Sequence, residues 1–200
     1  MASSLKTAPS TPVPVQYQSA GQTRPWTEPI PTTWNTTGSA TCVLTANSVG
    51  YFLIVANGFG FAIPAGATIN GIIVEYKVNT AGTDTVYDSE VVMVKGGVLG
   101  SINRASATSW KINDWLSHGG ATDLWGTTWT PAQINAADFG SAVSPKLIGA
   151  TSYDAVLTGC RITVYYTETS VKTVNGLAKA SVKTKNYLAL ASIKTFNGLQ

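Results

Sequence analysis

The alternation of apolar and polar residues predicts short β-strands through the middle of the chain. In residues 69–78 every second side chain from Ile72 to Val78 is apolar, and Glu75 and Lys77 lie on the opposite side. Further β-rich runs, with turn signals between them, are residues 41–45, 51–55, 86–94 and 160–166. Roughly seven to nine such strands over about 130 residues are typical of an antiparallel β-sandwich or jelly roll. The predicted fold class is all-β, with the sandwich over residues 39–168.

One short helix is predicted to interrupt this pattern. Thr130 is a favourable N-cap, Pro131 suits the first helical position, and Gln133 completes a capping box. Residues 138–140 (Asp-Phe-Gly) then return the chain to the sheet, so the helix has one or two turns.

Residues 1–38 hold six of the nine prolines. Proline fixes φ and donates no hydrogen bond, so this stretch is expected to form an extended, polyproline-like arm rather than a helix or a central strand. Trp26 and Trp34 do not suit a solvated linker. We interpret them as anchors that dock the arm onto its own domain or onto a neighbouring subunit.

Residues 169–200 contain an eleven-residue repeat, whose three copies begin at Ser170, Ser181 and Ser192. Because eleven is odd, one continuous strand would invert its faces at every copy. Two-residue turns at the Asn-Gly and Asn-Tyr positions remove this conflict, and Asn-Gly favours a hairpin. A β-meander is therefore favoured over the alternative, an eleven-residue helical repeat.

The charge is distributed unevenly between these regions. Residues 1–169 carry eight Lys or Arg and ten acidic residues, about −2, and residues 170–200 carry five Lys and no acid, about +5. The tail could meet an acidic partner, or its lysines could keep exposed strand edges soluble. Five Lys without Arg do not form a signature for sequence-specific nucleic acid binding. The candidate partner-binding residues of the tail are Lys172, Lys183, Lys185, Ile193, Lys194 and Phe196.

The sequence contains few of the ionisable side chains that catalysis commonly uses, since charged residues make up 12% of it and it contains one histidine. His118, in Ser-His-Gly-Gly, is predicted to be a polar loop residue rather than part of a catalytic triad. Asp84, Asp88 and Glu90 follow no calcium-loop signature and are interpreted as solvated strand residues. No metal or cofactor motif is present, so we expect no cofactor and no enzymatic activity.

Cys42 and Cys160 follow no metal-binding spacing and are expected to be buried free thiols, with a disulfide as the alternative. No apolar stretch is long enough to span a membrane, and the N-terminus lacks the apolar core of a signal peptide. We therefore expect a soluble protein made in a cytoplasm.

Four tryptophans are concentrated in a loop-rich stretch: Trp110, Trp115, Trp125 and Trp129. They could pack over one open end of the sandwich. Alternatively, Trp115 and Trp125 could stack on a glycan.

Residues 58–72 (GFGFAIPAGATINGI) resemble a segment that recurs in virion-associated proteins of tailed bacteriophages. Similar segments follow in the same order at residues 94–97, 123–126, 130–135, 139–140 and 162–166. The resemblance covers about residues 50–167, and the Asn-Gly-Leu repeats also look like the ends of phage structural proteins. It implies a β-sandwich without enzymatic activity, located in the virion and made in the bacterial host cytoplasm.

Our first hypothesis is a capsid decoration or cement protein, a homo-oligomer whose arms link neighbouring virion subunits by several weak contacts. One alternative is a tail or head–tail connector component. Another is a glycan-binding adhesion module that uses the tryptophan-rich loops.

The repeat tail leads to a first prediction. Its apolar face is rich in Ala and buries too little surface to fold alone, so we expect residues 170–200 to become ordered only against a partner subunit. Hydrogen exchange on the isolated protein should show fast exchange at Val182, Leu190 and Ile193 and protection in the assembly. Strong protection in a demonstrated monomer would contradict this account.

Overall fold

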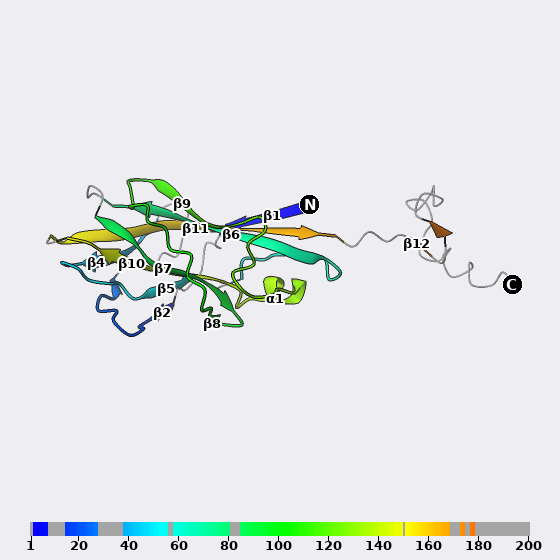
Figure 1. The fold of residues 1–200 in the computed structure, drawn as a ribbon, viewed down its shortest axis with the longest axis horizontal. Coiled ribbons are helices and arrows are strands. Elements are labelled where there is room, and N and C mark those ends of the chain that lie inside the picture. The colour runs from blue at the N-terminus through cyan, green and yellow to red at the C-terminus, as the bar shows by residue number, and fades with distance from the viewer. Residues whose placement is uncertain are drawn as a thin grey trace. The chain divides into compact units, whose positions relative to one another are not determined.

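The computed structural model describes residues 2–7, 15–27, 38–55, 58–80, 85–149, 151–168, 173–174 and 177–178. The chain divides into two compact units, residues 1–168 and residues 169–200. The first unit is a β-sandwich in which two antiparallel sheets face each other (Figure 1). This confirms the predicted all-β fold class. None of the described helices is long and apolar enough to cross a membrane.

The six-stranded sheet is built around β11 (Tyr153–Thr167), which pairs along almost its whole length with β6 (Thr68–Asn79). The remaining strands of this sheet are β1 (Ala2–Thr7), β3 (Trp26–Thr27), β4 (Ala40–Leu44) and β9 (Asp114–Gly120). Its order is β3-β4-β11-β6-β9, and β1 also pairs with β11.

The five-stranded sheet has the order β2-β5-β10-β7-β8. Its strands are β2 (Val15–Tyr17), β5 (Phe52–Val55), β7 (Val86–Lys95), β8 (Val98–Leu99) and β10 (Gly140–Leu147). β10 occupies the centre although it contains Pro145. The proline is tolerated because the β10–β7 register shifts between Ser144 and Pro145, where the ladder is already irregular.

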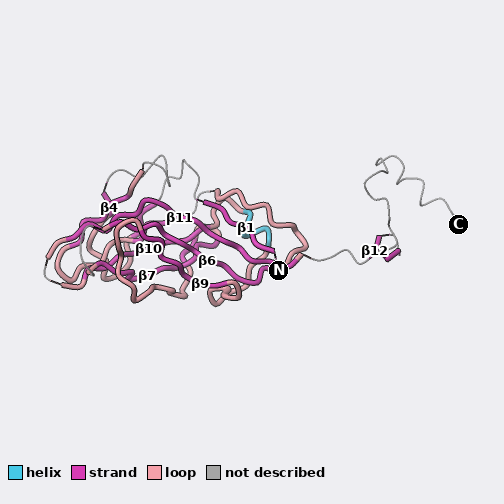
Figure 2. Tube along the Cα trace, turned by 90° about the horizontal axis from the view of Figure 1, so that it is seen from above, coloured by secondary structure: helices cyan, strands magenta, loops and turns pink. Residues whose placement is uncertain are grey.

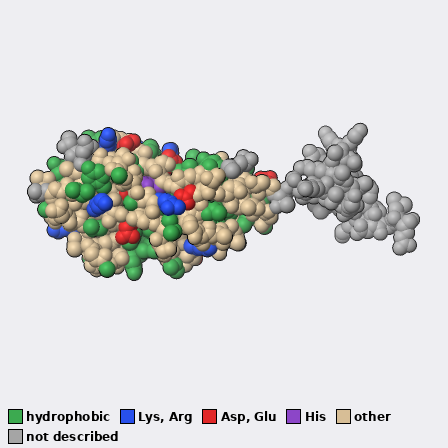
Figure 3. All heavy atoms as spheres, in the orientation of Figure 1, with side chains coloured by type: hydrophobic (Ala, Val, Ile, Leu, Met, Phe, Trp, Pro, Cys, Tyr) green, Lys and Arg blue, Asp and Glu red, His purple; other side chains and the backbone are tan. Residues whose placement is uncertain are grey.

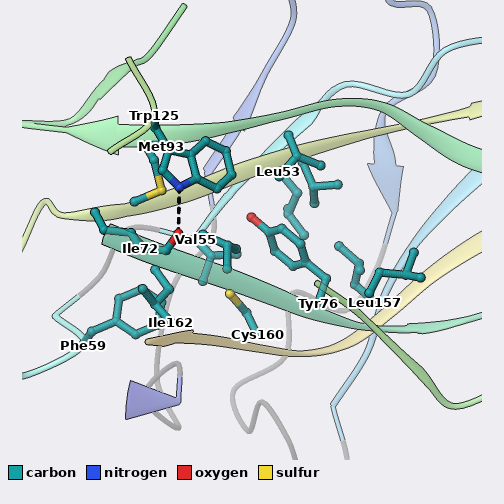
Figure 4. Packing of buried hydrophobic residues seen from close by; sticks show 14 of the residues in the cluster. Leu53, Val55, Phe59, Ile72, Tyr76, Met93, Trp125, Leu157, Cys160 and Ile162 are labelled. Carbon is teal, nitrogen blue, oxygen red and sulfur yellow. Dashed lines mark hydrogen bonds between the residues drawn. The ribbon is translucent and has the colours of Figure 1, made fainter. Parts of the chain in front are cut away.

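The core lies between the sheets, and alternation places it there. Ile72, Val74, Tyr76 and Val78 of β6 are at most 1% exposed, as the sequence pattern predicts. Figure 4 shows Tyr76 among Leu53, Leu157 and Cys160, which come from both sheets. The predicted helix is also confirmed: α1 (Pro131–Asn135) begins after the N-cap Thr130, and its capping box with Gln133 is complete.

The described residues within 1–38 do not form the separate arm that the sequence predicted. β1, β2 and β3 are strands of the two sheets, and each fits into a stretch without proline. Trp26 is 3% exposed, and its indole Nε1 donates to the Tyr51 carbonyl at 2.7 Å. Its side chain therefore anchors the segment in its own sandwich and is not available to a neighbouring subunit. Trp34 lies outside the described residues.

The short helix α1 lies toward one end of the sandwich (Figures 1 and 2), and four buried aromatic side chains gather around it and the strand that follows. We call Phe59, Phe61, Trp129 and Phe139 the aromatic cap. The Phe139 ring meets the rings of Phe61 and Trp129 edge-on, with centroids 5.7 and 5.4 Å apart. Phe59 stacks on Phe61 at 6.1 Å. Such contacts add to the free energy gained from burying the rings.

Asn135, at the end of α1, joins the aromatic cap to the loop that contains Ile63. Its side-chain amide donates to the Ile63 carbonyl, and its side-chain oxygen accepts from the Ile63 amide, both at 2.9 Å. One side chain thus satisfies both backbone groups of a residue outside the regular strands, which would otherwise lack a partner.

The two cysteines are buried free thiols, and burial raises the pKa of each to about 12. Cys42 lies opposite Ala155 of β11, five residues before Cys160. Five strand residues span roughly 16 Å, whereas a disulfide needs Cα atoms within about 7 Å. The two cysteines therefore cannot form a disulfide with each other in this fold.

In the second unit, β12 (Thr173–Val174) pairs antiparallel with β13 (Leu177–Ala178). Val174 lies opposite Leu177, so two residues separate the strands at the predicted Asn-Gly turn position. The six candidate partner-binding residues of the tail lie outside the described residues.

The role of Asn135 leads to a second prediction. Asn135→Ala removes two hydrogen bonds and should lower the free energy of unfolding by about 1–3 kcal/mol, because the Ile63 amide and carbonyl lose their partners. Urea denaturation measures this change. Asn70→Ala is the matched control, since it removes one exposed bond to Thr167, and it should change stability by less than about 0.5 kcal/mol. Equal effects of the two substitutions would contradict the role given to Asn135.

Candidate functional site

His118 lies in the core rather than in a polar loop, which corrects the prediction from its sequence context. It is on β9 and 3% exposed. Its Nε2 is 3.7 Å from Asp88 Oδ2, and its Nδ1 is 3.0 Å from the Arg104 carbonyl. A carbonyl can only accept, so Nδ1 carries the proton in this contact. β9 pairs with β6 here, and the alternation of the strand turns the imidazole inward.

Asp88 is also buried rather than solvated, at 1% exposure. Its carboxylate accepts from Trp110 Nε1 at 2.8 Å and from the Ser106 amide at 3.0 Å. Burial raises the pKa of Asp88, and the neighbouring His118 and these hydrogen bonds oppose that shift. In the described part of the chain, no serine or cysteine side chain hydrogen-bonds to His118. The pair therefore joins β7 to β9 inside the core and does not form a catalytic triad.

The acidic residues do not assemble into a cation site in the described structure. No group of three or more His, Cys, Asp or Glu side chains that could hold a metal ion occurs among the described residues. Asp84 lies outside them.

Trp115 lies on the outer face of the six-stranded sheet, because its neighbours Leu116 and His118 point inward. The Arg161 guanidinium stacks on its ring, with Cζ 4.2 Å from the centroid. Arg161 also donates two hydrogen bonds of 2.7 Å to Glu75. The Arg161 cation therefore covers one face of the partly exposed Trp115 ring.

A cavity of about 430 Å³ lies where the end of β7 and the β8 hairpin meet the loop at residues 125–129. Two segments of the chain line it: Met93, Lys95 and residues 98–102 from the first, and residues 125–127 and Trp129 from the second. Figure 4 shows Met93 beside the Trp125 indole. The volume falls in the range of small-molecule sites, which combine apolar walls with a few polar groups.

Hydrogen bonds fix both indole rings of the cavity. Trp125 Nε1 donates to the Ile72 carbonyl at 3.0 Å, drawn as a dashed line in Figure 4. Trp129 Nε1 donates to the Leu124 carbonyl at 3.0 Å. With their N–H groups occupied and exposures of 3% and 6%, the rings can offer a ligand apolar surface but no hydrogen bond.

The loop that carries Trp125 is itself clamped. Asp123 accepts from the Trp125 amide at 2.8 Å and from Arg104 at 2.7 and 3.1 Å. The hydrogen bond from Arg104 lowers the pKa of the Asp123 carboxyl, so Asp123 remains ionised and its charge is paired.

The predicted pair Trp115 and Trp125 is not brought together. Trp115 lies opposite Lys77 of β6, and the Trp125 indole bonds to Ile72 of the same strand. Five strand residues separate Ile72 from Lys77, a distance of roughly 16 Å along the sheet. Trp125 instead shares a cavity with Trp129. Sequence reasoning missed Lys95, Ser101 and Thr127 on the cavity walls, and the concentration of tryptophans was the one signal that pointed to this region.

Comparisons with known proteins give a distant structural likeness. No protein-family model matches the chain, and no curated protein matches its sequence. It is similar to a solved structure described as the xylan-binding module CBM15, with a TM-score of 0.43 and 11% identity over 82% of this chain and 97% of that one. A family 30 carbohydrate-binding module of a Clostridium thermocellum cellulosomal cellulase has a TM-score of 0.39 and 11% identity, covering 81% and 97%.

Proposed function

We propose that the protein is a non-enzymatic binding module that takes the end of a saccharide into the cavity lined by Trp125 and Trp129. The observation that carries this proposal is the composition of that cavity. Two fixed indole rings provide apolar surface for the C–H face of a sugar ring. Ser101, Thr127 and Lys95 are polar residues on the same walls, and their side chains supply hydrogen-bonding groups.

The shape of the cavity supports a chain end or a short saccharide over a long polymer. Trp125 and Trp129 are walls with little exposed surface rather than a flat row of open rings. A ligand must therefore enter the cavity to meet them. Because Trp125 Nε1 and Trp129 Nε1 are already bonded, the rings lose little conformational freedom on binding.

The residues that line the cavity support binding rather than hydrolysis. They include no carboxylate, imidazole or thiol among the described residues. Glycoside hydrolysis ordinarily needs two carboxylates placed on either side of the scissile bond.

A cavity-filling substitution gives the third prediction. Ser101 is exposed at the cavity wall, so Ser101→Tyr should fill the cavity and abolish saccharide binding while the melting temperature stays close to that of the wild type. Binding is measured on an array of defined glycans and then by calorimetry with the saccharides that bind. Ser117→Tyr is the matched control, on an exposed position of β9.

A third variant, Trp115→Ala, separates the two tryptophan sites. It removes the ring beneath Arg161 and should leave cavity binding unchanged. An array without bound glycans would overturn the proposed function, and a glycan lost with Trp115→Ala but kept with Ser101→Tyr would move the site to the outer sheet face.

A second candidate function is a structural component of a phage particle, in the capsid or in the tail. It is supported by the fact that most of the segments that carry the resemblance meet at the capped end. Residues 58–72, 123–126, 130–135 and 139–140 are joined there by the Asn135–Ile63 bonds, the Trp125–Ile72 bond and the ring contacts of Phe139. The appendage available for linking subunits is then the second unit, since β1, β2 and β3 belong to the sandwich.

Mass spectrometry of purified virions tests this candidate and gives the fourth prediction. The protein should be present in hundreds of copies per particle if it decorates a capsid and in about a dozen or fewer if it belongs to a tail or connector. Absence from purified particles would exclude the structural role and leave the binding module unaffected.

A further inference from the structure

The cavity walls carry one charged side chain among the described residues, Lys95. It is half-buried at the end of β7. Its Nζ donates to the Thr128 carbonyl at 2.8 Å and lies 5.0 Å from the centroid of the Trp129 ring. These two contacts hold the ammonium group at the cavity wall without neutralising its charge, because a carbonyl and an indole ring are both uncharged.

The charge of Lys95 has no acidic partner within the described structure. The ion pairs there join Arg104 to Asp123 and Arg161 to Glu75, and the buried Asp88 carboxyl lies 3.7 Å from His118 Nε2. Asp123 is the acid bonded to the cavity loop, and its charge is already paired with Arg104. Asp138 has its backbone carbonyl bonded to the Gly97 amide of the β7–β8 hairpin, but it is exposed and forms no ion pair with Lys95.

An ammonium group has three donors, and one of them is used by Thr128. We propose that the cavity selects acidic saccharides and that Lys95 binds the ligand's carboxylate; this inference rests on the proposed function. A charge-assisted hydrogen bond from an ammonium to a carboxylate is stronger than one to a neutral hydroxyl. A partly enclosed cavity weakens the screening by water that would otherwise reduce this difference.

The expected preference is about tenfold or more for an acidic sugar over its neutral counterpart, given the usual strength of charge-assisted hydrogen bonds. The preference should weaken as ionic strength rises, because the cavity is partly open to solvent and salt screens the charge of Lys95.

Calorimetry on the full chain tests the inference with two matched pairs of probes, D-glucuronate with D-glucose and D-galacturonate with D-galactose. Lys95→Gln removes the charge and keeps a hydrogen-bond donor, so the acid-to-neutral affinity ratio should fall close to one. Lys95→Arg should keep the preference. Lys111→Gln is the matched control, because Lys111 is exposed and does not line the cavity.

The outcomes separate the two proposals. Tighter binding of the acids that is lost in Lys95→Gln supports the inference. Equal binding of acid and neutral sugar, or a preference that survives in Lys95→Gln, overturns it and leaves the proposed function standing. If neither member of either pair binds and the glycan array is also empty, the proposed function itself fails. Melting temperatures of all three variants establish that each is folded.

Discussion

The cavity depends on a close approach of two backbones that glycine alone permits. A Cβ at Gly71 would lie 2.3 Å from the Ala121 carbonyl carbon, and a Cβ at Gly119 would lie 2.3 Å from the Ile72 carbonyl oxygen. Gly119 also has a φ of +82°, which glycine adopts without strain. Because these positions carry no side chain, the loop after β9 folds back over β6, and Ile72 bonds to Asp123 through its amide and to Trp125 through its carbonyl.

Several of the segments on which the phage hypothesis is based meet in the same region. They lie far apart in the sequence, and hydrogen bonds and ring contacts join several of them to one another. Pro131 starts α1, α1 places Asn135 against Ile63, and Phe139 then enters the core between Phe61 and Trp129. These contacts assemble the aromatic cap. Two further segments of the same set, residues 94–97 and 123–126, supply Lys95 and Trp125 to the neighbouring cavity.

The sequence predicted the elements that local physical chemistry determines. The alternation in β6 and the capping box of α1 are complete within a few residues, so they can be read without the rest of the chain. β9 could not be predicted in this way, because its sequence, Asp-Trp-Leu-Ser-His-Gly-Gly, has weak β-propensity. It forms a strand by pairing with β6. The prolines around β1, β2 and β3 argued against strands in that region, and Pro145 argued in the same way against a central strand at β10. The cavity could not be predicted from the sequence either, since Lys95 and Trp129 are brought together only by tertiary contacts.

On the face shown in Figure 3, charged side chains are few and scattered, so no charged patch marks a site.

Trp125 shows how such a cavity is maintained. Its φ of +56° is uncommon for a residue with a side chain, and Gly126 follows in the same left-handed region at +68°. A conformation of this kind costs about 1–3 kcal/mol and persists where the surroundings determine it. Here the Asp123 carboxylate holds the Trp125 amide, the Ile72 carbonyl holds its indole, and a Cβ on Gly126 would lie 2.5 Å from Ile102 Cγ1. A relaxed turn at this point would move the ring away from Lys95 and Trp129. Of the three described non-glycine residues with positive φ, two are Asn47 and Asn113, a residue type that tolerates this region, and the third is Trp125. The less tolerated conformation therefore falls on a residue that lines the cavity, where the surrounding contacts fix the position of its ring.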